Sequence, residues 1–377
     1  MYLLEHDAKQ LLARHGIAAP QGCLLKTSGI SALPPGPWVV KGQITAGGRG
    51  KAGLIRTAET AAEVNARTAE IIGKQVKGRT VRAVRVEQQV HDAAEAYLSM
   101  LLDPAAAGVR VIMAAQGGMD IETLPREALR MATAAPDAAA LADAAEKLAA
   151  SFPGATGRAL AEAGRAMAAA FVAEEALLIE INPLFVRSDG SWIAGDAKFV
   201  TDDAALPRQP GQRALLADPS GPYLETALKD AHGCDYVVVD PLGKIALLTT
   251  GAGLSMMLID ELRAAGLKPY NFLDIRTGGL RGETKRLINV LQWMHEGQNV
   301  RVLLINIFAG ITDLAEFSQL LVSALKDVPE FRVPVVARLV GNGMETARAV
   351  LAEAGITLHT DLDAALAEVR MHLGGRK

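Results

Sequence analysis

Glycines and cations gather in the stretch VVKGQITAGGRGKAG, residues 39–53. Its glycines let the backbone approach a ligand closely and direct amides at it, while Arg49 and Lys51 supply positive charge. Lys41, at the end of the preceding apolar run, adds a cation on the same side. The phosphate-loop formula requires Ser or Thr after the lysine and then a helix, but Ala52 and a strand-like run follow here. We therefore predict a glycine-rich hairpin loop that covers a triphosphate; a solvated basic turn is the alternative for this motif alone.

A second group of residues offers oxygen ligands for the Mg²⁺ that accompanies a nucleoside triphosphate. It lies in ALLIEINPLFV and SWIAGDAKFV, two strand-like runs joined by an Asp-Gly turn. Residues two apart in a strand share a face, so Glu180 and Asn182 point the same way. A two-residue turn would set Asn182 opposite Ala197, whereas a three-residue turn or a bulge sets it opposite Asp196. We predict the latter, and hence a metal site of Asn182 and Asp196; a solvated polar face is the alternative.

Beyond residue 235, short apolar runs alternate with helical stretches of about 15 residues, as parallel strands joined by crossover helices require. The runs are YVVVDPLGKIALLTT, KPYNFLDI, VRVLLINIF and VPVVARLV, followed by ITLHT and a last helix capped by Thr360 or Asp361. Glycines follow the strands in TTGAG, DIRTGG, FAGIT and LVGNG, where amides and helix N-termini can face an anion. We predict a parallel sheet covered on both faces, with a ligand site at its carboxyl edge, although tight turns alone would also need these glycines.

The first half of the chain is less regular. Its N-terminus, MYLLEHDAKQLLARHG, is expected to form an amphipathic helix ended by Gly16 and not a signal peptide. PWVVKGQI and AGLIRTA are expected to be neighbouring strands, and RTVRAVRVEQQV and EAYLSMLLD a further antiparallel pair. An alanine-rich stretch, 125–176, is expected to be helical, and the proline-rich segment 201–222 is the best linker candidate.

Composition narrows the possible partners and the compartment. The net charge of −3 gives no electrostatic reason to expect nucleic acid or an anionic membrane surface. No apolar run approaches the roughly 20 residues of a membrane-spanning helix. The two cysteines, Cys23 and Cys234, exclude a disulfide framework, and the seven histidines form no H-E-x-x-H motif. We expect a cytoplasmic protein with no nucleic-acid or membrane partner.

Several motifs in order resemble the β subunit of ADP-forming succinyl-CoA synthetase and related acid–CoA ligases such as malate–CoA ligase. They are VVKGQITAGGRGKAG, EINPL, AGDAK, TGAGLSMMLID, NFLDI, LINIFAGIT and ARLVGN. The resemblance covers nearly the whole chain and is weakest in the alanine-rich middle. It implies an α/β fold with an ATP-grasp domain over 1–215, a linker over 216–234 and a flavodoxin-like parallel-sheet CoA-ligase domain over 235–377.

The resemblance also implies a partner α subunit that binds CoA and carries a histidine phosphorylated in turnover. The β subunit would hold Mg-ATP and phosphorylate that histidine, and CoA would attack the acyl phosphate formed next. Nucleotide binding falls, by motif, on Lys41, Gly48, Arg49, Gly50, Glu87, Val90 and Glu95. Lys41 and the glycine loop would hold phosphates, while Glu87, the backbone around Val90, and Glu95 would lie near adenine and ribose.

The remaining roles follow the same motifs. Asn182 and Asp196 would bind Mg²⁺, and Glu180 would meet the partner's histidine, because a carboxylate orients an imidazole and stabilises its charged form. The acid substrate would be met at Thr250, Gly310, Ile311 and Thr312. The last three open a helix whose bare amides favour an anion.

Two departures from the family pattern concern the acid. Thr250 stands where the succinate enzymes have Asn, and an Arg-Cys-Asp-like run is replaced by AGIT and then Asp313. A lost cation and a gained carboxylate should weaken the binding of a second substrate carboxylate, because like charges repel. We expect a small carboxylic acid, a dicarboxylate such as succinate or malate or a close analogue.

Two other functions remain open at this point. The chain is alternatively a non-catalytic nucleotide-binding paralogue, or an ATP-grasp ligase that needs no partner. The complete set of Lys41, Glu180, Asn182 and Asp196 argues against the first. The lack of an evident second mononucleotide unit for CoA argues against the second.

Overall fold

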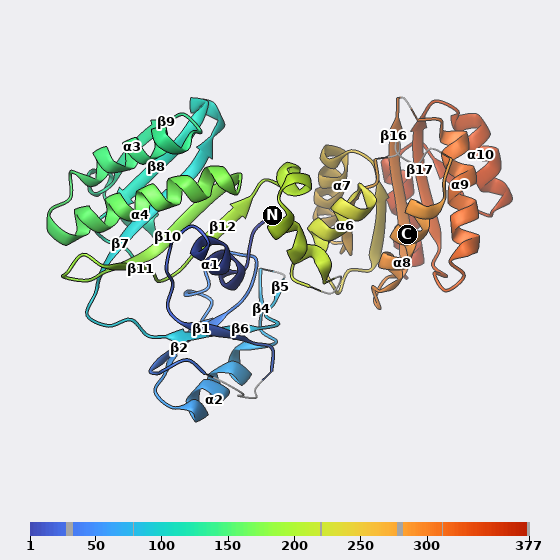
Figure 1. Ribbon diagram of the computed structural model, residues 1–377. Helices are drawn as coiled ribbons and strands as arrows, with labels where there is room; N and C mark the ends of the chain where they lie inside the picture. The colour runs from blue at the N-terminus through green and yellow to red at the C-terminus, as the bar shows by residue number, and fades with distance from the viewer. Residues whose placement is uncertain (28–32, 78, 219–220, 277–281, 311, 375–377) are drawn as a thin grey trace. The chain divides into compact units, whose positions relative to one another are not determined.

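The computed structural model describes residues 1–27, 33–77, 79–218, 221–276, 282–310 and 312–374 (Figure 1). The chain forms two compact units, Met1–Pro222 and Tyr223–Lys377. Within the described parts, no helix combines the length and the apolar character that crossing a membrane requires.

The first unit begins with the predicted amphipathic helix, α1 (Glu5–Ala13), and Gly16 lies beyond its end with a φ of +77°. A four-stranded antiparallel sheet follows, whose strands in spatial order are β1 (Gly22–Leu25), β6 (Val84–Gln88), β2 (Trp38–Gly42) and β3 (Ile55–Ala58). The pairing of β2 with β3 confirms the predicted neighbours. Helix α2 (Ala61–Ile71) packs its buried Val64 and Ile71 on this sheet. A small hairpin joins β4 (Gln75–Val76) to β5 (Arg79–Thr80).

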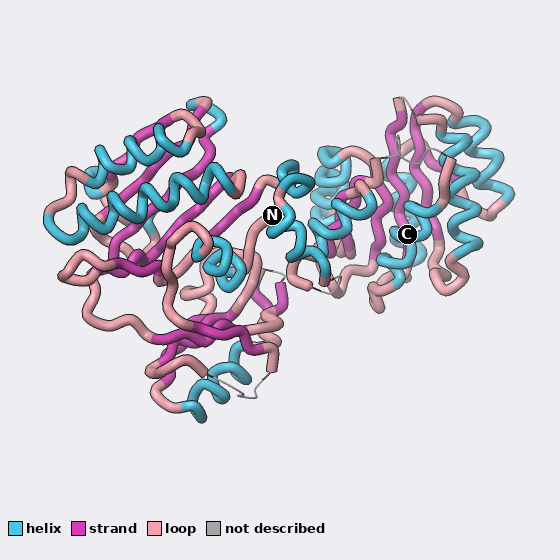
Figure 2. Tube along the Cα trace, viewed as in Figure 1, coloured by secondary structure: helices cyan, strands magenta, loops and turns pink. Residues whose placement is uncertain are grey.

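A larger antiparallel sheet carries the other strands of this unit. In spatial order they are β11 (Trp192–Ala194), β10 (Ala176–Val186), β7 (Ala94–Asp103), β8 (Gly108–Ala114) and β9 (Arg130–Ala134), and β12 (Lys198–Thr201) also pairs with β10. Helices α3 (Ala138–Ala149) and α4 (Gly154–Ala173) lie side by side over one face of this sheet (Figures 1 and 2). Small residues allow the close approach, since a Cβ on Gly164 would lie 2.7 Å from that of Ala145.

Two expectations for this region are wrong. The predicted pairing of RTVRAVRVEQQV with EAYLSMLLD does not occur, because β6 pairs with β1 and β2 while β7 pairs with β8 and β10. The chain turns at Asp92, with a φ of +54°, and passes from one sheet to the other. The stretch 125–176 is also not helical throughout, because β9 forms the outer strand beside β8 before α3 begins.

The connection of β10 to β11 decides which side chains face each other. Arg187 donates to Ser191 and Gly190 donates to Arg187, so three residues form the turn, with Gly190 at a φ of +91°. Pairs on either side, Leu184 with Ala194 and Glu180 with Lys198, keep one register. That register places Asn182 opposite Asp196, as predicted from a three-residue turn.

Short helical turns and two further helices, α5 (Pro210–Arg213) and α6 (Leu224–His232), follow β12. Helix α6 falls inside the stretch 216–234 that was expected to be a linker.

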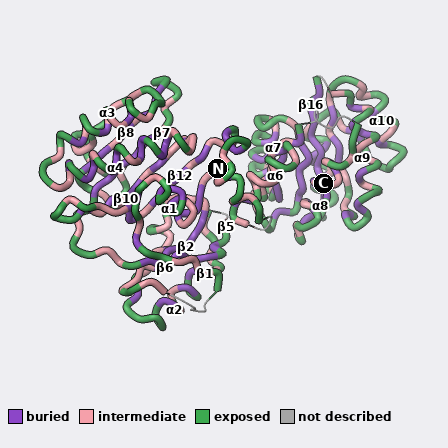
Figure 3. Tube along the Cα trace, in the orientation of Figure 1, coloured by how far each residue is buried: buried purple, intermediate pink, exposed green. Residues whose placement is uncertain are grey.

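In the second unit a parallel sheet has the order β14 (Ile245–Thr249), β16 (Val302–Ala309), β17 (Val335–Gly341) and β18 (Leu358–His359). These strands are mostly buried, and the helices around them are more exposed (Figure 3).

Helices cover both faces of this sheet, as predicted. One face buries α7 (Ala252–Ala264) and α11 (Leu362–His372), and the other buries α8 (Lys285–His295), α9 (Leu314–Asp327) and α10 (Met344–Glu353). The Asp361 side chain accepts from the Ala364 amide and caps α11, which confirms one of the two predicted caps.

The expected strand YVVVDPLGKIALLTT is two strands. Its first part, β13 (Asp235–Val238), pairs antiparallel with β15 (Asn271–Asp274), and a turn closed by Gly243 leads to β14. The Asn271 side chain binds both the amide and the carbonyl of Leu247, each at 2.9 Å, and so joins β15 to β14. The run therefore contains a change of direction at Pro241-Leu-Gly, which its apolar composition did not indicate.

Candidate functional site

A cavity of about 760 Å³ in the first unit is lined by parts of both larger sheets and by the glycine loop. The residues of this unit that were predicted to bind nucleotide or metal or to act in catalysis all lie on its wall: Lys41, Gly48, Arg49, Gly50, Glu87, Val90, Glu95, Glu180, Asn182 and Asp196. The fold thus brings together positions that are far apart in the sequence. Their individual roles stay predictions.

The glycine loop is a hairpin connection between β2 and β3 and not the start of a helix. Leu54 donates to Arg49 and Ala52 donates to Gly48, so the loop folds back on itself. Gly48 and Gly53 have φ values of +86° and +66°, which favour glycine over any residue with a Cβ. The loop can therefore present bare backbone to the cavity, as the sequence predicted.

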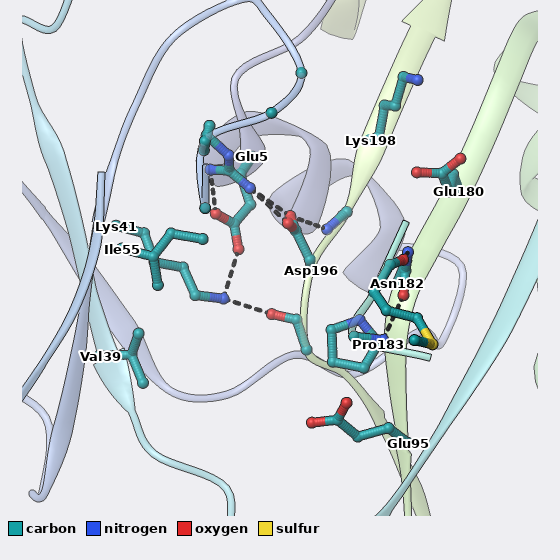
Figure 4. A pocket seen from close by; sticks show the side chains of 18 of the residues that line it. Glu5, Val39, Lys41, Ile55, Glu95, Glu180, Asn182, Pro183, Asp196 and Lys198 are labelled. Carbon is teal, nitrogen blue, oxygen red and sulfur yellow. Dashed lines mark hydrogen bonds and ion pairs between the residues drawn. The ribbon is translucent and has the colours of Figure 1, made fainter. Parts of the chain in front are cut away.

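Lys41 is a buried cation on the cavity wall. Its Nζ donates to the Gly195 carbonyl at 2.6 Å and pairs with Glu87 at 2.6 Å and with Glu5 at 3.1 Å (Figure 4). Burial alone would lower the pKa of Lys41, but the charges of Glu5 and Glu87 raise this pKa above its ordinary value. Lys41 is therefore protonated at any physiological pH.

Arg49 links the glycine loop to the opposite wall. Its Nη1 donates to Glu5, and its Nη2 donates to both carboxylate oxygens of Asp196, at 2.6 and 2.7 Å (Figure 4). Burial opposes the charge, but Asp196 and Glu5 raise the pKa of the guanidinium. The loop is held a second time at its exposed Lys51, which pairs with Asp120.

Three charged residues at the site were missed by sequence reasoning: Glu5, Lys9 and Arg85. Lys9 pairs with Glu5 at 2.7 Å and with Glu87 at 2.8 Å, and Arg85 donates to Glu87 at 2.6 Å. A signal for two of them was present, because Glu5 and Lys9 interrupt the apolar face of α1 next to Ala8 and Leu12. Charged groups on a buried face need partners, and their partners lie in this cavity.

Glu87, Val90 and Glu95 were expected near adenine and ribose. Glu87 is 2% exposed and its carboxylate is held by Lys9, Lys41 and Arg85, so it faces the cation cluster. Glu87 also lines the cavity. Val90 is partly buried, and exposed Glu95 lies against Gly118, whose added Cβ would clash with Glu95 Oε2. For all three residues the expected place near adenine and ribose stays a prediction.

The predicted metal ligands lie across from each other, but each is engaged. Asp196 accepts from Arg49, while Asn182 Oδ1 accepts from the Gly118 amide at 2.7 Å and Asn182 Nδ2 donates to the Met119 carbonyl at 2.9 Å. Among the described residues, no group of three or more His, Cys, Asp or Glu side chains is placed to hold a metal. A cation here would thus need oxygen ligands from a bound substrate.

Glu180 lies on β10 between Ser99 of β7 and Lys198 of β12, with which it is in register. The Tyr97 hydroxyl donates to Glu180 Oε2 at 3.1 Å. Burial, and then the charge of Glu180, raises the pKa of Tyr97, so the hydroxyl keeps its proton. Tyr97 therefore fixes one oxygen of the carboxylate.

The residues predicted to meet the acid lie in the second unit, at the carboxyl edge of its parallel sheet. Thr250 directly follows β14, and Gly310 directly follows β16. The register of these strands, continued by one residue, sets Thr250 opposite Ile307, so Gly310 lies about 10 Å further along the strand direction. Ile311 falls outside the described residues, and Thr312 precedes the N-cap of α9.

The chain matches two family models. Residues 2–186 match the ATP-grasp domain and residues 248–371 match the CoA-ligase domain. The β subunit of ADP-forming succinate–CoA ligase from Chloroflexus aurantiacus is 38% identical over 364 residues, with 94% of each chain covered. The corresponding subunit from Ignicoccus hospitalis is 32% identical, with 98% of each chain covered.

A solved structure shares the fold over the whole chain. ATP citrate lyase from Methanothrix soehngenii, in complex with citrate and coenzyme A, aligns with a TM-score of 0.73 over 99% of both chains. Its sequence identity of 18% limits this likeness to the fold. The expected succession of an ATP-grasp domain and a parallel-sheet CoA-ligase domain is confirmed.

Proposed function

The chain belongs to the family of β subunits of ADP-forming succinate–CoA ligases, and on that premise we propose that it is the β subunit of an ADP-forming acid–CoA ligase, an acid–thiol ligase. Its ATP would phosphorylate a histidine of a partner α subunit, and that phosphoryl group would pass to a small carboxylic acid. Coenzyme A would then displace phosphate from the acyl phosphate to give the acyl-CoA. The observation that carries the proposal is one cavity whose walls bear the two cations Lys41 and Arg49, a pair of oxygen ligands and Glu180.

Lys41 and Arg49 are the side chains that we assign to the ATP phosphates. Both are protonated, and both reach the cavity from the β2 hairpin. Gly48 and Gly50 are exposed, so their amides can approach phosphate oxygens without obstruction from a side chain. Charge and bare backbone together suit a triphosphate better than a neutral ligand.

Asn182 and Asp196 are the residues that would hold Mg²⁺. The donor chemistry fits, because Mg²⁺ bound with a nucleotide takes one or two protein oxygens and completes its shell with phosphate and water. The ion, when bound, would neutralise phosphate charge during the transfer. A site with one carboxylate and one amide needs those additional oxygens.

Glu180 is the group that we assign to the partner's histidine. A carboxylate that accepts an imidazole N–H orients the ring and stabilises its charged form. Tyr97 binds Oε2, so Oε1 is the oxygen assigned to the imidazole. Glu180 would thus position the histidine for phosphoryl transfer.

The acid is assigned to Thr250, Gly310, Ile311 and Thr312. We propose a small carboxylic acid, most simply a dicarboxylate such as succinate or malate or a close analogue. Asp313 caps α9 by accepting from the Ala315 amide at 2.8 Å. The helix N-terminus therefore compensates part of its charge, and a negatively charged acid nearby is less strongly repelled than the sequence alone indicates.

The test is phosphorylation of a partner. The chain, isolated from its source with co-purifying proteins, is given Mg²⁺ and radiolabelled ATP. We expect acid-labile label on a second chain, discharged by CoA together with one acid of a panel. ATP binding without a labelled partner would favour the non-catalytic paralogue, and acyl-CoA formation by this chain alone would favour a stand-alone ligase.

A further inference from the structure

We propose that Glu5 is a positioning residue that holds the two phosphate-binding cations, Lys41 and Arg49, in place with one buried carboxylate. The inference rests on the proposed function, because it takes these cations to bind ATP. Glu5 lies on the first turn of α1, outside the motifs that carry the family resemblance. It touches neither the glycine loop's amides nor the predicted metal ligands in any described contact.

The geometry places Glu5 between the two cations. Its Oε1 pairs with Lys41 Nζ at 3.1 Å, and its Oε2 accepts from Arg49 Nη1 (Figure 4). Lys41 comes from β2 and Arg49 from the glycine loop, so a helix, a strand and a loop meet at one carboxylate. The Glu5 side chain is 1% exposed. Water therefore has little access to the Glu5 carboxylate.

Charge keeps this carboxylate ionised. Burial would raise the pKa of Glu5, but the charges of Arg49, Lys41 and Lys9 hold it well below its usual range. Lys9, one turn along α1, pairs with Glu5 at 2.7 Å and also donates to the Gly195 carbonyl at 2.8 Å. Lys9 thus binds Oε1 of Glu5, whereas Arg49 binds Oε2.

Arg49 has one buried and one more exposed partner. Glu5 is 1% exposed, whereas Asp196 is 28% exposed. When Asp196 takes a metal, the bond of Arg49 Nη1 to Glu5 can persist while Nη2 becomes available for phosphate. Glu5 would thus keep Arg49 at the cavity through the exchange, and donors held in place bind a ligand with a smaller loss of conformational freedom.

The experiment measures nucleotide binding by the full chain, by calorimetry at a temperature where every variant is folded. In Glu5→Gln we expect ATP to bind about tenfold more weakly, with adenosine binding changed less than twofold, because only the phosphates meet Lys41 and Arg49. Glu174→Gln is the matched control: this carboxylate pairs with His15 and accepts from Gln212 in the same unit, away from the cavity. We expect it to leave ATP affinity unchanged.

If Glu5→Gln does not fold, a second variant tests the same proposal. Glu5→Gln with Lys9→Met removes one buried charge of each sign, which is often tolerated, and should show the same selective loss for ATP. Unchanged or tighter ATP binding in either folded variant would overturn the inference, as would equal losses for ATP and adenosine. A wild-type chain that binds no ATP would instead overturn the proposed function, and the inference with it.

Discussion

Arg49 and Asp196 form a bidentate ion pair, in which Arg49 Nη2 reaches both carboxylate oxygens at 2.6 and 2.7 Å. Arg49 is assigned to ATP phosphate and Asp196 to Mg²⁺. In this structure the guanidinium and the carboxylate that would bind these ligands bind each other instead. A metal cannot take either oxygen of Asp196 without weakening a hydrogen bond from Arg49. We infer that metal binding at Asp196 and release of Arg49 towards phosphate occur together.

Replacing Arg49 should therefore separate the two events. In Arg49→Gln the carboxylate of Asp196 loses its cationic partner and keeps the bond from the Ala197 amide, and we expect Mn²⁺ to bind the nucleotide-free chain about fivefold more tightly, since a partly exposed charge pair contributes about 1 kcal/mol. ATP affinity should fall in the same variant. Electron paramagnetic resonance of free Mn²⁺ measures the first effect and calorimetry the second. Asp196→Asn is the control and should bind Mn²⁺ weakly, and an unchanged Mn²⁺ affinity in Arg49→Gln would show that the pair does not compete with the metal.

Glu180→Gln should slow phosphoryl transfer without affecting ATP binding. The amide keeps an acceptor for Tyr97 but cannot stabilise a charged imidazole, and loss of such a group costs about 10²–10⁴-fold in rate. The measurement is the rate at which labelled phosphate appears on the partner subunit, at saturating ATP. A parallel loss of ATP affinity would reassign Glu180 to nucleotide binding.

The ion cluster predicts how stability depends on pH. Because cationic neighbours hold the pKa of Glu5 below its unfolded value, the ionised carboxylate stabilises the fold above about pH 4.3, the ordinary glutamate pKa. That contribution is lost as the pH falls through the lowered pKa of the folded state. Urea unfolding followed between pH 7 and pH 3 should show a falling free energy of unfolding, with a shallower fall in Glu5→Gln. Glu353→Gln, an exposed site on α10, should keep the wild-type slope, and an equal slope in both variants would contradict the assignment.

Local sequence rules predicted those parts of the site that depend on neighbouring residues. The absence of Ser or Thr after Lys51 predicted a loop in place of a phosphate-binding helix start. The residues 182 and 196 lie opposite each other because three residues form the turn before Ser191, a length that the Asp-Gly pair alone does not decide.

Other parts depend on contacts between distant segments. The strand containing Glu87 and the strand containing Glu95 are adjacent in the sequence but belong to different sheets, and no local pattern distinguishes that arrangement from a hairpin. The buried position of Glu5 depends on Lys41 and Arg49, about 40 residues away, so its charge was visible in the sequence but its partners were not. The same limit applies to Asn271, whose side chain joins β15 to β14, two strands that belong to different sheets of the second unit.

Thr250→Asn should shift the acid preference towards succinate. Thr250 follows β14 at the carboxyl edge, and the resemblance implies Asn at this position in the succinate enzymes. An amide adds a donor that reaches further than the threonine hydroxyl. The measurement is the ratio of kcat/KM for succinate to that for each other acid of the panel. If the ranking of acids does not change, Thr250 does not contact the substrate.

Asp313→Asn tests whether the carboxylate at the start of α9 opposes a second negative charge on the acid. Asn caps a helix about as well as Asp, so the bond to the Ala315 amide and the stability of α9 should persist. Loss of one nearby like charge should lower the KM for a dicarboxylic acid about fivefold, since such a contact is worth about 1 kcal/mol in water. A monocarboxylic acid should show no such gain, and neither should Glu316→Gln, an exposed acid in the same first turn. Equal KM values for the dicarboxylic acid in Asp313→Asn and wild type would place the distal end of the substrate away from Asp313.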